Sequence, residues 1–102
     1  MSKNERIKKV IINSIEEINQ QLQKENQLEK STNTVLFGKD GKLDSLGLVN
    51  LLVIIEQNIE DELQVIITLA DERAISQRNS PFRTVETLAN YIEILLEEQL
   101  NG

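Results

Sequence analysis

Apolar residues recur at helical spacing through much of this 102-residue sequence. Between residues 4 and 29, apolar positions are separated by steps of four, four, three and four, and Lys, Glu, Asn and Gln fill most of the other positions. This stripe consists of Ile7, Ile11, Ile15, Ile18 and Leu22. The spacing places them all on one face of an amphipathic helix, which must bury that face against another element.

Two further stripes predict two more long helices. The second is expected at residues 45–58, where apolar side chains surround most of the helix circumference. Such a composition indicates deep burial, an exposed apolar flank kept for a partner, or both. The third is expected at residues 84–99, with the Thr84 hydroxyl suited to cap its first turn.

The segments between these stripes predict loops and one short helix. Residues 30–44 lose the periodicity and contain Gly38 and Gly41, which indicates a long loop tied to the core by Val35, Leu36 and Phe37. Residues 65–67 favour a short extended piece, and residues 69–76 can form two helical turns before Pro81 interrupts the chain. The sequence therefore predicts one all-α domain over residues 1–102. We expect a four-helix bundle with helices at about 4–29, 45–58, 69–76 and 84–99.

Composition narrows the function classes. The chain has no cysteine and no histidine, so the commonest general base and the usual zinc ligands are missing, and we predict neither an enzyme nor a metal site. A net charge of −6 argues against nucleic acid as a partner. No segment approaches the ~20 apolar residues of a membrane span, and the first residues lack the apolar core of a signal peptide. We therefore expect a cytoplasmic protein without stable membrane insertion.

Charge is unevenly distributed along the chain. Four basic residues, Lys3, Arg6, Lys8 and Lys9, lie among the first ten positions, whereas residues 43–72 contain no Lys or Arg. The acidic middle is either a surface that attracts a basic partner or a solvated face that keeps the protein soluble.

The tripeptide Asp44-Ser45-Leu46 stands where the long loop meets the second helix. Asp and Ser are both favoured helix N-caps, so either side chain can simply cap this helix. The alternative is an accessible serine hydroxyl at a helix N-terminus, where free backbone N–H groups favour a phosphate group. The helix has no lysine and the chain no histidine to activate Ser45 as a nucleophile. Ser45 is therefore better suited to being modified by another enzyme than to catalysing a reaction.

This tripeptide, the following LGLVNLLVIIEQNIEDEL and the later FRTVETLANYI resemble the acyl carrier protein family. In that family, a separate transferase attaches 4′-phosphopantetheine from coenzyme A to the serine, and the thiol of the arm carries acyl groups as thioesters. The resemblance implies a four-helix bundle of acyl-carrier type with a long first loop and a short third helix. It implies Ser45 as the attachment site, with Asp44 and Leu46 presenting it. The implied partners are a phosphopantetheinyl transferase and the ligases, synthases or transferases that load acyl groups onto a monomeric carrier.

The resemblance also implies two further sets of residues. The surface expected to face partner enzymes consists of Gly47, Asn50, Val53, Ile54, Glu56 and Gln57. The cavity expected to admit an acyl chain is lined by Leu48, Leu51, Leu52, Ile55 and Leu88. Typical fatty-acid carriers have acidic side chains in the first turns of this helix, where Gly47 and Asn50 stand here. We therefore infer a specialised carrier in a dedicated lipid, polysaccharide or secondary-metabolite pathway.

Two alternatives stand beside this interpretation. An aminoacyl or peptidyl carrier uses the same arm, although such domains often have glycine just before the Asp or His of the serine motif, where Leu43 stands here. A helical adaptor would bind a partner through the apolar flank of the helix at 45–58, with Ser45 serving only as a cap.

Overall fold

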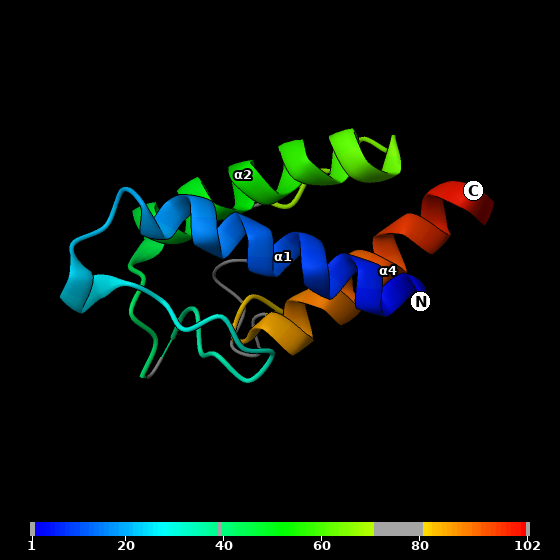
Figure 1. The fold of residues 1–102 in the computed structure, drawn as a ribbon. Coiled ribbons are helices and arrows are strands. Elements are labelled where there is room, and N and C mark those ends of the chain that lie inside the picture. Colours follow the sequence, from blue (N-terminus) through cyan, green and yellow to red (C-terminus); the bar gives the residue numbers. More distant parts are fainter. Residues whose placement is uncertain (1, 39, 71–80, 102) are drawn as a thin grey trace.

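The three apolar stripes fold as three α-helices around a shared core (Figure 1). The computed structural model describes residues 2–38, 40–70 and 81–101. Its elements are α1 (Lys3–Asn19), a 3-10 turn η1 (Lys24–Asn26), α2 (Ser45–Leu63) and α4 (Val85–Asn101). The described residues contain no β-strand, so the predicted all-α class is confirmed. The radius of gyration is 12.8 Å, close to the ~13 Å typical of a folded domain of about 100 residues.

The first helix, α1, begins as predicted but ends earlier. The Ser2 Oγ accepts a hydrogen bond from the Glu5 backbone N–H at 3.1 Å and caps the first turn. The predicted end near residue 29 is wrong, because the helix stops at Asn19. The Asn19 side chain accepts from the Leu28 N–H at 2.8 Å and donates to the Leu28 carbonyl at 2.9 Å. Residues 23–27 have no apolar side chain to bury, so continuing the helix would bring no tertiary packing.

The second helix, α2, begins at Ser45 as predicted and continues to Leu63 instead of ending near residue 58. Ile59 is fully buried and Leu63 packs against the core, so the apolar stripe extends past the predicted end. Gln64 then takes a left-handed conformation with φ 56°, and its N–H donates to the Glu60 carbonyl at 2.9 Å. This backbone cap ends the helix.

Residues 64–70 have no regular secondary structure. The extended piece predicted at 65–67 lies in this segment and pairs with no strand among the described residues. Ile67 and Leu69 are buried while Ile66 and Thr68 are exposed, an alternation typical of an extended chain. Residues 69 and 70, the start of the predicted short helix, are not helical, and residues 71–76 lie outside the described part of the chain. The fourth helix therefore stays a prediction.

The last helix, α4, starts directly after its predicted cap. The Thr87 backbone N–H donates to the Thr84 Oγ1 at 3.1 Å, which confirms Thr84 as the cap. Phe82 is buried just before the helix and meets Tyr91 edge-to-face, with 5.8 Å between ring centroids and 83° between ring planes. The helix bounds agree with the predicted 84–99 to within the usual fraying of helix ends.

The core lies between α1 and its two neighbours, because α1 packs against both α2 and α4 (Figure 1). Among the residues that the structure describes, one polar side chain, Ser14, is fully buried with the apolar ones. Its hydroxyl donates to the Val10 carbonyl at 2.8 Å and accepts from the Asn58 side chain at 2.9 Å. A buried hydroxyl satisfied in this way links α1 to α2 without the cost of an unpaired polar group.

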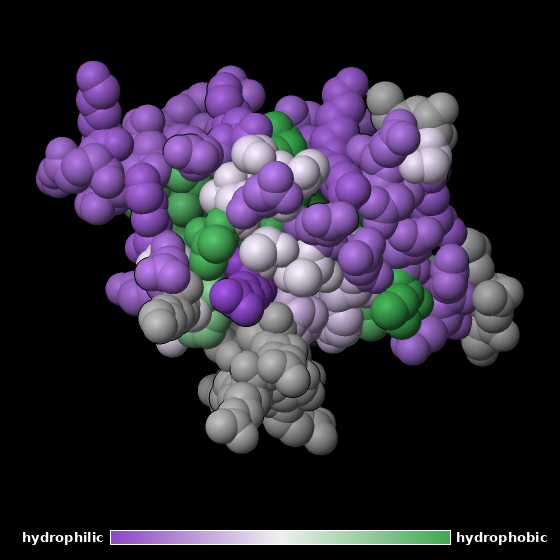
Figure 2. Space-filling view, turned by 90° about the horizontal axis from the view of Figure 1, so that it is seen from below, coloured by the Kyte–Doolittle hydropathy of each residue, from purple (hydrophilic) through white to green (hydrophobic). Residues whose placement is uncertain are grey.

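Hydrophilic side chains cover most of the face seen in Figure 2, with small apolar patches between them. In the part of the chain that the structure describes, no helix combines the length and hydrophobicity needed to cross a bilayer. Large apolar side chains are exposed at a few described positions, namely Leu46, Val53, Ile66 and Ile94. The first two belong to α2, Leu46 in its first turn and Val53 near its middle.

Candidate functional site

The long loop before α2 is held against the start of α4. The Leu36 N–H donates to the Arg83 carbonyl at 2.6 Å, and the Val85 N–H donates to the Thr34 carbonyl at 3.2 Å. Val35 and Thr84 form an isolated antiparallel bridge between the same two segments. Leu36 is fully buried and Phe37 packs against the core, which confirms the predicted apolar tie at these two positions. The loop therefore holds the start of α2 in a defined place.

A tight turn brings the loop back to α2. Gly38 has φ 96°, a conformation that glycine adopts readily, and the Gly41 N–H donates to the Gly38 carbonyl at 3.0 Å. A Cβ atom on Gly41 would lie 2.7 Å from the Phe37 backbone. The Leu43 N–H then donates to the Leu36 carbonyl at 3.2 Å, and Leu43 is buried immediately before the helix. Glycine at position 41 allows this close approach of the two backbone segments.

Replacing Gly41 with Ala should lower the free energy of unfolding by about 1–3 kcal/mol, because the new Cβ would force the Phe37 backbone to move. Gly47→Ala is the matched control. Its Cβ would lie 3.2 Å from the side-chain atoms Leu43 Cδ2 and Asp44 Oδ1 and not against backbone, and alanine favours a helix by up to about 1 kcal/mol. Urea unfolding monitored by circular dichroism measures both variants. Equal stability of the two would contradict the close approach at Gly41.

Asp44, rather than Ser45, caps α2. The Asp44 Oδ1 accepts a hydrogen bond from the Gly47 N–H at 2.7 Å, and the Asp44 carbonyl accepts from the Leu48 N–H at 2.9 Å. The sequence left both residues as possible caps, and the structure assigns the role to the aspartate. Ser45 is consequently the first residue of the helix itself.

Asp44→Ala should lower the free energy of unfolding by about 1 kcal/mol, the usual cost of losing an N-cap. The same substitution at Asp61, an exposed residue of α2 far from its start, removes an equal charge without removing a cap. Thermal unfolding of the two variants side by side measures the difference. A loss of stability that is no greater for Asp44→Ala than for Asp61→Ala would refute the capping role.

Ser45 is exposed, and its hydroxyl forms no hydrogen bond with any residue that the structure describes. A catalytic serine needs a base within hydrogen-bonding reach, and no such base lies beside Ser45 in the described structure. The free N–H groups of the first helical turn lie next to the hydroxyl and carry partial positive charge, which stabilises a nearby phosphate. The arrangement suits a hydroxyl that receives a phosphate-linked group from another enzyme.

An exposed row of side chains leads away from Ser45 along α2. It consists of Leu46, Asn50, Val53 and Gln57, spaced by four, three and four residues and therefore on one helix face. Leu46 is 70% exposed and Val53 is 41% exposed. Of the other residues predicted to face partners, Gly47 and Ile54 are half-buried, and Ile54 packs against the core. The structure thus adds Leu46 to the predicted surface and places most of Ile54 inside.

Glu56, also predicted to face partners, holds the segment after α2. Its Oε2 accepts hydrogen bonds from the backbone N–H groups of Leu69 and Ala70, the latter at 3.2 Å. The carboxylate is half-buried, and the contact joins positions 13 residues or more apart in sequence. Sequence spacing gives no signal for such a contact, which depends on how the chain returns along α2.

The five residues predicted to line an acyl-chain cavity are all fully buried, namely Leu48, Leu51, Leu52, Ile55 and Leu88. The structure brings them together in the core shared by α1, α2 and α4. The pockets near the ends of α2 and α4 and beside the long loop are lined by other residues, and these five side chains pack in the core. An acyl chain would enter only if these side chains moved apart, and the cavity stays a prediction.

Comparisons with known proteins place this chain in no family: no family model matches it, and no curated protein or solved structure is significantly similar. The class that the fold and the site define is therefore a small helical protein with an accessible serine at the start of a central helix. Any function assigned to it depends on the chemistry available at Ser45 and on the surface beside it.

Proposed function

We propose that this protein is an acyl carrier protein whose Ser45 bears a 4′-phosphopantetheine arm. The observation that carries the proposal is the free, exposed Ser45 hydroxyl in the first turn of α2. Because Asp44 caps the helix, the Ser45 hydroxyl is not used as the cap. The sequence resemblance around this motif and the long loop that precedes it support the same assignment.

The attachment needs only an accessible hydroxyl on this chain. A transferase removes the Ser45 proton, and the Ser45 Oγ attacks the phosphorus that joins pantetheine to the nucleotide of coenzyme A. The new O–P bond forms as the bond to adenosine 3′,5′-bisphosphate breaks. The N-terminus of α2 stabilises the resulting phosphodiester. Asp44 uses Oδ1 for the cap, so its carboxylate would still have an oxygen available to help the transferase hold a metal ion.

The exposed row along α2 is the surface proposed to meet partner enzymes. The first turn of the helix contains no acidic residue, and the row itself consists of two apolar and two amide side chains. Enzymes that recognise it would rely on apolar and hydrogen-bonding contacts more than on a basic patch. This supports a carrier that serves a dedicated lipid, polysaccharide or secondary-metabolite pathway.

Hydroxylamine treatment of the protein purified from its own cells tests the carrier function. Hydroxylamine cleaves thioesters but leaves the phosphodiester at Ser45 in place. The expected result is a loss of acyl mass from the protein while the arm remains. The mass lost also identifies the cargo, so it separates a fatty acyl carrier from an aminoacyl or peptidyl carrier. An arm that never carries a hydroxylamine-sensitive group would refute a carrier of either kind.

One observation favours the adaptor as a second candidate. Leu46 and Val53 expose apolar side chains on one face of α2, where a partner can pack. An adaptor would keep its partner after Ser45→Ala, whereas a carrier would lose its function. A pull-down from cell extract with the native protein and with this variant compares the two.

The Ile55→Phe variant tests the predicted acyl-chain cavity. Ile55 is fully buried in α2, so a larger side chain would occupy space that an acyl chain needs. We expect arm attachment at the native rate and a shorter maximum acyl chain on the loaded protein. Reaction with acyl-coenzyme A substrates of increasing length, followed by intact-mass measurement, gives both quantities. Equal effects on attachment and on chain length would count against a cavity at this position.

A further inference from the structure

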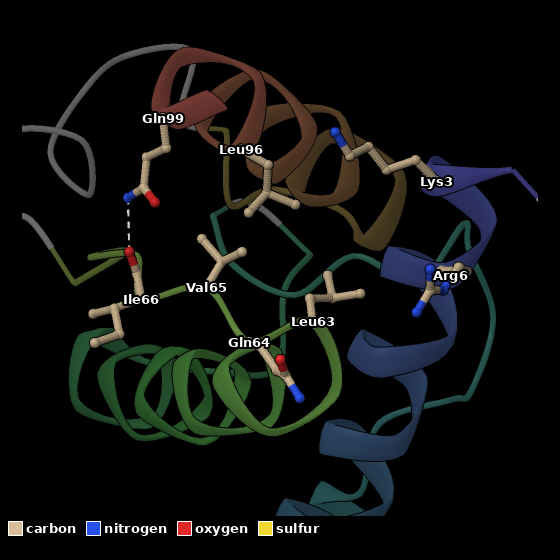
Figure 3. Close-up of a pocket in the computed structure, with 8 residues that line it drawn as sticks. All are labelled: Lys3, Arg6, Leu63, Gln64, Val65, Ile66, Leu96 and Gln99. Atoms are coloured by element: carbon tan, nitrogen blue, oxygen red, sulfur yellow. Dashed lines mark hydrogen bonds between the residues drawn. The ribbon is translucent and has the colours of Figure 1, made fainter. Parts of the chain in front are cut away.

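Three helix ends meet at the end of the bundle opposite Ser45 and enclose a groove of about 570 Å³ (Figure 3). Its floor is apolar and consists of Leu63, Val65 and Leu96, which Figure 3 shows turned toward the space between α2 and α4. Leu96 is 3% exposed, and the other two are half-buried against the core. The volume falls within the range of roughly 300–1,000 Å³ typical of small-molecule sites.

Hydrogen bonds between elements hold the walls of this groove together. The Gln99 Nε2 donates to the Ile66 carbonyl at 2.7 Å and ties the segment after α2 to the last turns of α4 (Figure 3). The Asn4 Nδ2 donates to the Glu93 Oε2 at 2.7 Å and ties the start of α1 to the same helix. Three separate segments are therefore fixed around the apolar floor, and the groove has a defined shape.

Two cations border the groove on the α1 side. Lys3 and Arg6 line it, both are exposed, and neither forms an ion pair with any described residue. Lys9 continues this row into an adjoining hollow of about 360 Å³, which Arg6 and Glu62 also line. In a chain of net charge −6, such a group of unpaired cations makes this edge locally attractive to an anion.

We propose that this groove binds one single-chain fatty acid. Its alkyl chain lies on the apolar floor, and its carboxylate faces Lys3 and Arg6. A neutral ligand would leave the two cations unused, and a cationic amphiphile would be repelled by them. The groove lies about 27 Å from Ser45 along the axis of α2, so the proposal does not depend on any modification of that serine.

Calorimetric titration of the full-length, unmodified protein with decanoate below its micelle concentration tests this site. The expected result is saturable binding at one site per chain, tightening by up to about fourfold for each added methylene. The double variant Lys3→Gln/Arg6→Gln should bind about fivefold more weakly, since two exposed charge contacts are lost. Lys24→Gln removes a charge from η1, which the structure places at the far end of the molecule, and should bind as the native protein does (Figure 1).

Four results would overturn the proposal. The first is the absence of saturable decanoate binding, and the second is equal binding of decyltrimethylammonium, which has the same chain and the opposite charge. The third is an equal effect of the double variant and Lys24→Gln. The fourth is a concentration-dependent dimer in light scattering that decanoate does not dissociate, because the groove would then be an interface between two copies. Ser45→Ala should bind decanoate like the native protein, so this test and the test of the carrier function can fail separately.

Discussion

Replacing Ser45 with Ala should abolish transfer of a phosphopantetheine arm while leaving the fold intact. The oxygen that would form the bond to phosphorus is then missing, and no other residue lies in the same position at the start of α2. The free energy of unfolding should change by less than about 0.5 kcal/mol, because Ser45 is exposed and the cap is supplied by Asp44. Incubation with a fluorescent coenzyme A analogue and a broad-specificity transferase, followed by gel imaging, measures the transfer.

Ser31→Ala is the control for this experiment. Ser31 lies in the loop that precedes α2, and its hydroxyl accepts a hydrogen bond from the Asn33 N–H at 3.2 Å. This variant should be labelled like the native protein. Labelling of Ser45→Ala at the native level would refute Ser45 as the attachment site. A loss of stability of about 1 kcal/mol in Ser45→Ala would instead indicate that the serine contributes to the cap.

Truncation of Leu51 should produce the largest loss of stability among the variants considered. Leu51→Ala should lower the free energy of unfolding by about 2–5 kcal/mol, since the side chain is fully buried in the centre of α2 and its removal leaves a cavity. For a domain of this size such a loss is a large fraction of the total stability. Urea unfolding monitored by circular dichroism gives the value.

Val53→Ala is the matched comparison on the same helix. Val53 is 41% exposed, so its truncation removes few core contacts and should cost less than about 1 kcal/mol. Similar losses for the two variants would contradict the orientation of α2, in which Leu51 faces the core and Val53 faces solvent. If Leu51→Ala lowered the free energy of unfolding by less than about 2 kcal/mol, the neighbouring side chains would have moved into the space that the leucine leaves.

Helix starts were predictable because their signals are local. The side chains of Asp44 and Thr84 each carry an oxygen that accepts a hydrogen bond from the backbone N–H three residues later. In both cases the apolar stripe begins directly afterwards. Burial followed from the periodicity of the apolar stripes. Four of the five positions assigned to the predicted cavity lie on α2, and the fifth, Leu88, lies on α4. The exposed serine also followed from its place between a loop and a helix.

The ends of α1 and α2 and the tertiary contacts were not predictable, because they depend on residues far apart in sequence. The end of α1 is set by the Asn19 amide and the Leu28 backbone. The hydrogen bonds of Glu56 to residues 69 and 70 likewise required the path of the chain after α2. The groove at the end of the bundle opposite Ser45 is formed by three segments that are far apart in sequence. The spacing of apolar residues does not indicate that these segments come together.

The proposed function depends on Ser45 accepting one covalent arm, and the intact mass of the protein tests this most directly. The native protein is incubated with coenzyme A and a broad-specificity phosphopantetheinyl transferase, and its mass is recorded before and after. The account predicts a gain equal to one phosphopantetheine per chain, located by fragmentation at Ser45. An unchanged mass, or a gain located at any other residue, would contradict it.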